Sequence, residues 1–147
     1  MTSNEVVLSF WEAMRSNDFE SASNWLSADF EGYWPQSREL TKGRGHFAKI
    51  NTAYPAQGKW KFRLNSIVTD GNAVVTDVSV TEGVTVGRAI TFHTVENGLI
   101  TRQKEFWPDE FEAPEWRKDL VNIVDEDTLQ NNPVQPTANT VADRGVS

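Results

Sequence analysis

Four stretches rich in Val, Ile, Thr and aromatic residues follow one another in the second half of the chain, and tight-turn dipeptides separate them. The dipeptides are Asp70-Gly71, Glu82-Gly83 and Asn97-Gly98. Glycine after a polar residue between two such stretches favours a β-hairpin. The sequence therefore predicts an antiparallel meander of four strands: Trp60 to Thr69, Ala73 to Thr81, Thr85 to Val95 and Leu99 to Trp107.

Two-residue loops at these turns predict which side chains share a face of the sheet. Asp77 then lies opposite Leu64 and Arg88, and Ile90 lies opposite Glu105, because paired residues share a face and the side-chain period is two. A bulge in any strand would reverse the faces beyond it. The predicted pocket face collects Trp60, Phe62, Leu64, Val75, Asp77, Ser79, Arg88, Ile90, Phe92, Gln103, Glu105 and Trp107.

This face mixes large apolar groups with a few charges at its middle, which is typical of a small-molecule pocket. The opposite face is apolar in part, so we expect it to meet solvent and to form a homodimer with a second subunit. It carries Arg63, Ile67, Val74, Val78, Val80, His93, Ile100, Arg102, Lys104 and Phe106.

Composition excludes several classes of protein. The chain has 147 residues, no Cys and two His, which removes disulfides and thiolate ligands and leaves little for a metal site. A net charge of −7 argues against a nucleic-acid partner. No apolar run approaches the roughly 20 residues that span a bilayer, and the N-terminus lacks a basic start followed by an apolar core. We therefore expect a cytoplasmic protein without a membrane or nucleic-acid partner.

The sequence predicts that the first half of the chain is mainly helical. Thr2 with Glu5, and Asn17 with Glu20, have the spacing of capping boxes. A strand within residues 29–37 is expected to end at Pro35, and a third helix should follow residues 43–45. The helical apolar stripes expected to pack on the sheet contain Val7, Phe10, Trp11, Met14, Phe19, Ala22, Trp25 and Leu26.

Beyond Trp107, Pro114 is expected to open a short helix through Trp116, Leu120 and Ile123 that packs on the sheet. From about residue 125 the composition is polar, with too few large apolar groups to offset the entropy of ordering. We therefore expect a single domain over residues 1–124 and a mobile tail over residues 125–147.

This order of helices, strand, helix and meander resembles the nuclear transport factor 2-like superfamily, over Val6 to Val124. Within it the chain resembles the SnoaL-like, or polyketide cyclase-like, branch. The stretches that carry the resemblance are Phe10-Trp11-Glu12-Ala13-Met14, Gly43-Arg44, Gly98-Leu99-Ile100 and Lys104-Glu105-Phe106-Trp107. The resemblance implies a cone-shaped α+β barrel with a pocket between sheet and helices. Members of the superfamily include ketosteroid isomerases, limonene-epoxide hydrolases, aldol-type cyclases and proteins without catalysis.

The resemblance also implies roles for individual residues. Cyclases and epoxide hydrolases of this fold use a carboxylate just before an aromatic pair in the last strand, the place of Glu105. The isomerase base would fall where this chain has Trp34, which argues against steroid isomerisation. The Arg-Asp pair of the epoxide hydrolases is missing, although Arg88 facing Asp77 across the hairpin would create a similar arrangement, or simply a structural ion pair.

The predicted chemistry needs no cofactor. An ionised Glu105 can abstract a proton beside a carbonyl or activate water, and a protonated one can donate to a developing enolate. Gln103 can orient a carbonyl or a water, and Trp34, Trp60 and Trp107 can stack on a flat ligand. Alternatively, a wrong register would leave Glu105 exposed.

Three functions remain open from the sequence. The first is a cofactor-free isomerase or cyclase that acts by proton transfer on an apolar carbonyl compound. The second is an epoxide hydrolase in which Glu105 activates water. The third is a non-catalytic ligand-binding or dimerisation module. His93 is expected at the surface or at an interface on the face away from the pocket.

Overall fold

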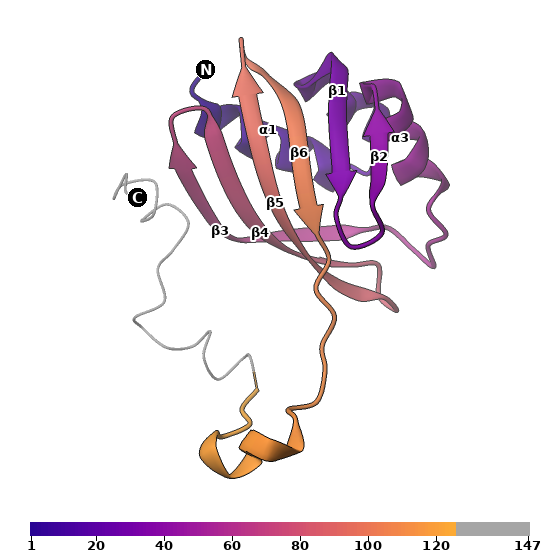
Figure 1. Cartoon of the computed structure of the whole chain (residues 1–147). Coiled ribbons are helices and arrows are strands. Elements are labelled where there is room, and N and C mark those ends of the chain that lie inside the picture. The colour runs from indigo at the N-terminus through magenta and orange to yellow at the C-terminus, as the bar shows by residue number, and fades with distance from the viewer. Residues whose placement is uncertain (126–147) are drawn as a thin grey trace.

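The computed structural model describes residues 1–125, which form a curved six-stranded sheet with helices against one face (Figure 1). The prediction of an α+β fold is confirmed, although the sheet stays open between its edge strands β2 and β3. The predicted tail beyond residue 125 lies outside the described residues. The helices are α1 (Ser3–Arg15), α2 (Phe19–Ala22), η1 (Ser23–Trp25), α3 (Arg44–Ala53) and η2 (Glu115–Leu120).

The strands follow the order β2-β1-β6-β5-β4-β3 across the sheet. All neighbours are antiparallel except β1 and β6, which are parallel. The predicted meander is confirmed to within one residue at each end. The strands are β1 (Leu26–Trp34), β2 (Glu39–Lys42), β3 (Lys61–Asp70), β4 (Ala73–Thr81), β5 (Val86–Glu96) and β6 (Leu99–Phe106).

The caps of the first two helices differ in how well the sequence predicts them. At α1 the capping box is present, because Thr2 Oγ1 accepts from the Glu5 N–H at 3.1 Å and the Glu5 carboxylate accepts from the Thr2 N–H. At α2 the predicted cap is wrong by one residue, since Asp18 caps the helix. Asn17, with φ +64°, instead bonds the backbone of Trp60 through both ends of its amide.

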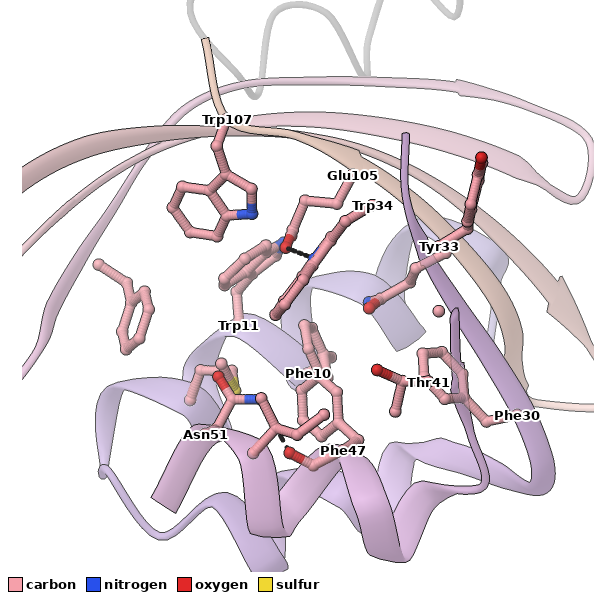
Figure 2. A pocket seen from close by; sticks show the side chains of 15 residues that line it. Phe10, Trp11, Phe30, Tyr33, Trp34, Thr41, Phe47, Asn51, Glu105 and Trp107 are labelled. Atoms are coloured by element: carbon pink, nitrogen blue, oxygen red, sulfur yellow. Dashed lines mark hydrogen bonds between the residues drawn. The ribbon is translucent and has the colours of Figure 1, made fainter. Parts of the chain in front are cut away.

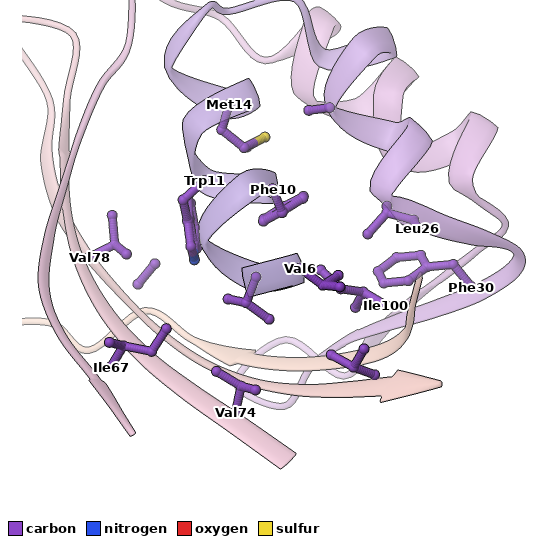
Figure 3. Close-up of a cluster of buried hydrophobic side chains, with 14 of the residues drawn as sticks. Val6, Phe10, Trp11, Met14, Leu26, Phe30, Ile67, Val74, Val78 and Ile100 are labelled. Atoms are coloured by element: carbon purple, nitrogen blue, oxygen red, sulfur yellow. The ribbon is translucent and has the colours of Figure 1, made fainter. Parts of the chain in front are cut away.

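The apolar stripe of α1 packs against the sheet and forms the centre of the core (Figure 3). Phe10 and Trp11 of α1 are almost fully buried, and their rings meet edge to face at 5.1 Å between centroids. Burial of these large rings supplies much of the hydrophobic stabilisation of the fold. The strands contribute Phe30, Ile67, Val74, Val78, Val80, Ala89, Val95 and Ile100 to the same core.

The loop between β4 and β5 is longer than the predicted two residues. Thr81 pairs with Val86, so the loop spans residues 82–85. Glu82 holds it closed, because its carboxylate accepts from the backbone N–H groups of Val84 and Thr85 at 2.9 and 2.5 Å. The register therefore moves by two residues, which preserves the faces but places Ser79, not Asp77, opposite Arg88.

Two β-bulges reverse the predicted faces over part of the sheet. In β3 the register shifts between Leu64 and Ser66, and in β6 it shifts at Thr101. Beyond the β6 bulge Gln103 and Glu105 share a face with the buried core. The predicted pocket residues in the middle of β4 and β5 lie on the opposite face. The predicted single pocket face is therefore wrong.

The face that we expected to meet solvent and a second subunit packs against α1 instead, over most of β4 and β5. Val74, Val78 and His93 are almost completely buried there. We call the side of the sheet away from the helices the outer face. It carries Val75, Asp77, Ser79, Arg88, Ile90 and Phe92.

The segment after β6 leads away from the sheet to η2 (Figure 1). The expectation that this helix packs on the sheet through Trp116 is wrong, because Trp116 is 74% exposed. Within residues 1–125, no helix is long and apolar enough to cross a membrane.

Candidate active site

A cleft opens between the helices and the end of the sheet where β6 finishes. Its inner chamber, of about 60 Å³, is bounded by Phe10 and Trp11 of α1, Trp34 of β1, and Gln103 and Glu105 of β6 (Figure 2). The chamber is thus mostly aromatic, with an amide and a carboxyl group on one wall. Its remaining lining residues are Met14, Phe30, Gly32, Tyr33, Thr41, Phe47, Ile50, Asn51, Phe62 and Trp107.

A wider outer chamber of about 220 Å³ adjoins the inner one. The two share Trp34, Phe62 and Trp107 on the sheet side and residues 50–51 of α3. The outer chamber is mostly apolar, which suits a hydrophobic ring or chain. Its own lining residues are Phe19, Tyr54, Trp60, Val80, Thr85 and Gly87.

Glu105 carries the carboxyl group of the inner chamber, and neutral donors surround it. One oxygen accepts from Trp34 Nε1–H at 3.1 Å, and the other accepts from the Thr91 hydroxyl at 2.6 Å. Burial raises the pKa of Glu105, while the hydrogen bonds from Thr91, Trp34 and Trp107 lower it to a smaller extent. The net result is a raised pKa, because burial is the largest of these effects.

A series of hydrogen bonds between buried polar side chains leads from Gln103 into the core. The amide nitrogen of Gln103 lies 3.1 Å from His93 Nδ1, and His93 Nε2 lies 2.8 Å from the Thr76 hydroxyl. Trp11 Nε1–H donates to the same hydroxyl at 3.2 Å. His93 is 2% exposed, so burial lowers its pKa to about 3 and the ring stays neutral. The expectation that His93 lies at the surface is therefore wrong.

Asp77 and Arg88 do not lie with Glu105. They form an ion pair on the outer face, with Arg88 Nε and Nη2 lying 2.5 and 2.9 Å from the two Asp77 oxygens. Asn65, the extra residue of the β3 bulge, donates to Asp77 and more closely to Ser79. This geometry matches the structural ion pair that we considered as the alternative.

The predicted ligand-binding residues divide between the two faces. Ile90 and Phe92 lie on the outer face, where Phe92 is 44% exposed and packs on Phe106. Their misplacement follows from the bulge in β6, which separated them from Glu105. The predicted residues that do line the cleft are Trp34, Trp60, Phe62, Gln103 and Trp107.

The sequence reasoning missed several residues of the cleft. Thr91 was overlooked because the unbulged register pairs Ile90, rather than Thr91, with Glu105. Phe10 and Trp11 were predicted as core, yet their rings also form the floor of the chamber. Nothing in the sequence pointed to Asn51 as a cleft residue, because a polar residue in a short helix is usually predicted to be solvent-exposed.

Within residues 1–125, no three His, Cys, Asp or Glu side chains gather closely enough to hold a metal ion.

Comparison with known proteins agrees with this architecture. The model of the SnoaL-like domain matches residues 7–103. The chain belongs to the SnoaL-like family. A search of curated proteins finds no match.

Solved structures place this SnoaL-like chain in the nuclear transport factor 2-like fold. A Kribbella flavida protein, provisionally assigned as a ketosteroid isomerase, is 26% identical with a TM-score of 0.77, over 84% of this chain and 90% of that one. An LEH-like epoxide hydrolase from M. tuberculosis is 19% identical, with a TM-score of 0.59 over 72% and 82%. A Jannaschia protein, provisionally assigned as a SnoaL-like polyketide cyclase, is 16% identical, with a TM-score of 0.61 over 71% and 84%. The last two likenesses concern the fold alone.

Proposed function

We propose that this SnoaL-like protein binds a small apolar carbonyl compound and catalyses proton transfer beside the carbonyl group, as an isomerase or cyclase does. The observation that carries the proposal is Glu105, a carboxyl group of raised pKa at the inner end of an aromatic cleft. A carboxylate with a raised pKa is a stronger base than an exposed one, and proton transfer needs such a group within reach of the ligand.

In this proposal the ionised Glu105 takes a proton from the carbon next to the carbonyl. The electron pair of the broken C–H bond moves into the enolate, and the carboxylic acid so formed returns the proton to another atom of the ligand. Trp34 and Thr91 hold the two carboxyl oxygens, which orients the group toward the chamber. The apolar walls exclude water and keep the carboxylate reactive.

The test is exchange of ligand protons for deuterium. A panel of one-ring and two-ring ketones is incubated with the protein in D2O, and loss of the signals of protons beside the carbonyl is followed by NMR. We expect the wild type to accelerate exchange for at least one ketone and Glu105→Gln to lose 10²-fold or more, roughly the contribution of general acid–base catalysis. The matched control is Asp77→Asn, the same change on the outer face of the sheet, which should retain the wild-type rate.

Two outcomes would refute parts of the proposal. If no ketone exchanges faster with the wild type, although the ketones bind, the cleft is a binding site without catalysis. If Glu105→Gln exchanges as fast as the wild type, another group is the base. The epoxide-hydrolase alternative, in which Glu105 activates water, would be favoured by a water held between Glu105 and Asp77. The two carboxylates lie on opposite faces of the sheet, so the structure gives this alternative no such support.

We also propose that the protein forms a homodimer through the outer face, rather than through the face first expected. Val68 of β3 pairs with Val75 and so lies on the outer face too, where Phe92 and Val68 are 44% and 43% exposed. An exposed apolar patch is typical of an interaction site. Light scattering after size exclusion should give twice the chain mass, and Phe92→Glu should halve it. A monomeric wild type would contradict this.

A cytoplasmic location stays a prediction from the sequence.

A further inference from the structure

Gln103 has one polar atom without a partner although the side chain is buried. It is 5% exposed and borders the inner chamber. Its amide nitrogen lies within hydrogen-bond distance of His93 Nδ1, at 3.1 Å. Among residues 1–125, no group donates a hydrogen bond to its carbonyl oxygen Oε1. Buried acceptors are nearly always satisfied, so an unsatisfied one at the wall of a cavity indicates a place where a ligand supplies the donor.

The orientation of the Gln103 amide and the tautomer of His93 depend on each other, and in the structure the amide nitrogen faces His93 Nδ1. An indole N–H can only donate, so Thr76 Oγ1 accepts from Trp11. An amide N–H can only donate as well, so His93 Nδ1 accepts from Gln103. The neutral imidazole then carries its proton on Nε2, which donates to Thr76. The reversed amide would require the proton on Nδ1, and the tautomer of His93 therefore reports the orientation of Gln103.

We propose that the inner chamber selects ligands whose polar end carries a hydroxyl group, which donates to Gln103 Oε1. His93 acts as a positioning residue that accepts from the amide nitrogen of Gln103, and Thr76 and Trp11 hold the His93 ring in place behind it. The inference rests on the proposed function in taking the same cleft as the ligand site, and it narrows the ligand class to hydroxylated apolar carbonyl compounds.

The arrangement of the two chambers supports this class of ligand. Gln103 and Glu105 stand two residues apart on one face of β6, with Cα atoms about 7 Å apart by strand geometry. A hydroxyl at Gln103 therefore leaves a neighbouring carbon of the ligand facing Glu105. The small inner chamber takes this polar end, and the wider apolar chamber takes the ring.

A ketone oxygen at the same place would face the carbonyl oxygen of Gln103 and leave both acceptors without a donor. Sites built to hydrogen-bond a hydroxyl discriminate against analogues that lack it, because the buried polar group is then unpaired. The expected preference is for the alcohol of any matched alcohol and ketone pair.

The test is calorimetric titration of the protein with 1-tetralol and with 1-tetralone, which differ only in this group. We expect the wild type to bind the alcohol about five- to tenfold more tightly, as one hydrogen bond supplies. Gln103→Met keeps the length of the side chain and should abolish the preference, and so should His93→Phe, which frees the amide to turn. Gln57→Met, the same change at an exposed position, should leave the preference unchanged.

A measurement on the unmodified side chains keeps the inference testable if these variants do not fold. Nitrogen-15 NMR of the histidine rings, with His46→Gln used to assign the His93 signals, should show Nε2 protonated and Nδ1 unprotonated. A proton on Nδ1 would overturn the inference, because the amide N–H would then face the chamber.

The outcomes separate this inference from the proposed function. If the wild type binds the alcohol and the ketone equally well, the hydroxyl preference is wrong. Catalysis by Glu105 is then still tested separately by the deuterium-exchange assay. Binding of neither compound overturns both proposals, since the cleft would not be a site for apolar molecules of this size. If Gln103→Met still binds the alcohol more tightly than the ketone, another group binds the hydroxyl and the inference is overturned.

Discussion

Acidification is expected to destabilise the protein through His93, whose ring is buried without a charged partner. The pKa of the folded imidazole is lowered to about 3, against an ordinary value of 6.5, and burial is the cause. The His93 imidazole of the unfolded chain therefore binds a proton as the pH falls through about 6.5, whereas the imidazole of the folded chain stays neutral. The contribution of His93 to stability is complete above pH 6.5 and is lost progressively as the pH falls toward 3.

The magnitude follows from the size of the pKa difference. Each pH unit below 6.5 removes about 1.4 kcal/mol from the free energy of unfolding, because one proton binds only to the unfolded state. The loss at pH 5 is thus about 2 kcal/mol relative to pH 8. The raised pKa of Glu105 acts with the opposite sign, since its protonated form is favoured in the folded state as the pH falls.

Comparison with His93→Gln isolates the histidine, since Glu105 and other groups contribute to both proteins. Urea unfolding is followed by circular dichroism at pH 8, 6.5 and 5. The difference in unfolding free energy between wild type and variant should shrink by about 2 kcal/mol from pH 8 to pH 5. His46→Gln, at an exposed histidine, measures the effect of losing a ring that is not in the core. A difference constant to within about 0.5 kcal/mol, a small part of that shift, would refute the buried neutral state of His93.

Four further predictions follow from the structure. Thr76→Val leaves the Trp11 N–H and His93 Nε2 without their buried partner and should cost about 2–4 kcal/mol in urea unfolding, whereas Thr76→Ser should cost less. Phe10→Ala, at a core position 1% exposed, should cost about 3–5 kcal/mol by the same measurement. The double variant Asp77→Asn/Arg88→Met should change stability by less than about 1 kcal/mol and leave tetralol affinity unchanged, as a partly exposed pair predicts. The exchange rate should decline on acidification at a pH above the ordinary carboxyl value of 4.5, because Glu105 must be ionised and its pKa is raised; a decline centred below 4.5 would contradict this.

The fold was largely predictable because its signals are local. Alternating β-branched residues and Gly-containing turns located β3 to β6 to within one residue. The capping box at Thr2 and the apolar stripe of α1 likewise depend on residues only three or four positions apart. The second cap failed because a distant partner, the backbone of Trp60, uses the Asn17 side chain.

The candidate site was only partly predictable. Glu105 was identified from its place before an aromatic pair, and the structure puts it in the cleft. The argument from register, which joined it to Asp77 and Arg88, failed at the bulge of β6 near Thr101, and the bulge of β3 near Asn65 likewise separated Leu64 from Asp77. Neither bulge follows a glycine or proline signal, so local reasoning had no means of finding it.

The order of the elements, their lengths and the identity of the apolar stripes were therefore set by short-range patterns that can be read along the chain. Which side of each strand meets α1 was decided by the folded sheet. A bulge depends on how a curved sheet fits around a helix, and that fit is a balance of packing between residues far apart in sequence. Because one bulge turns every later side chain over, it gave Glu105 the neighbours Trp34 and Thr91 in place of the charged pair on the outer face.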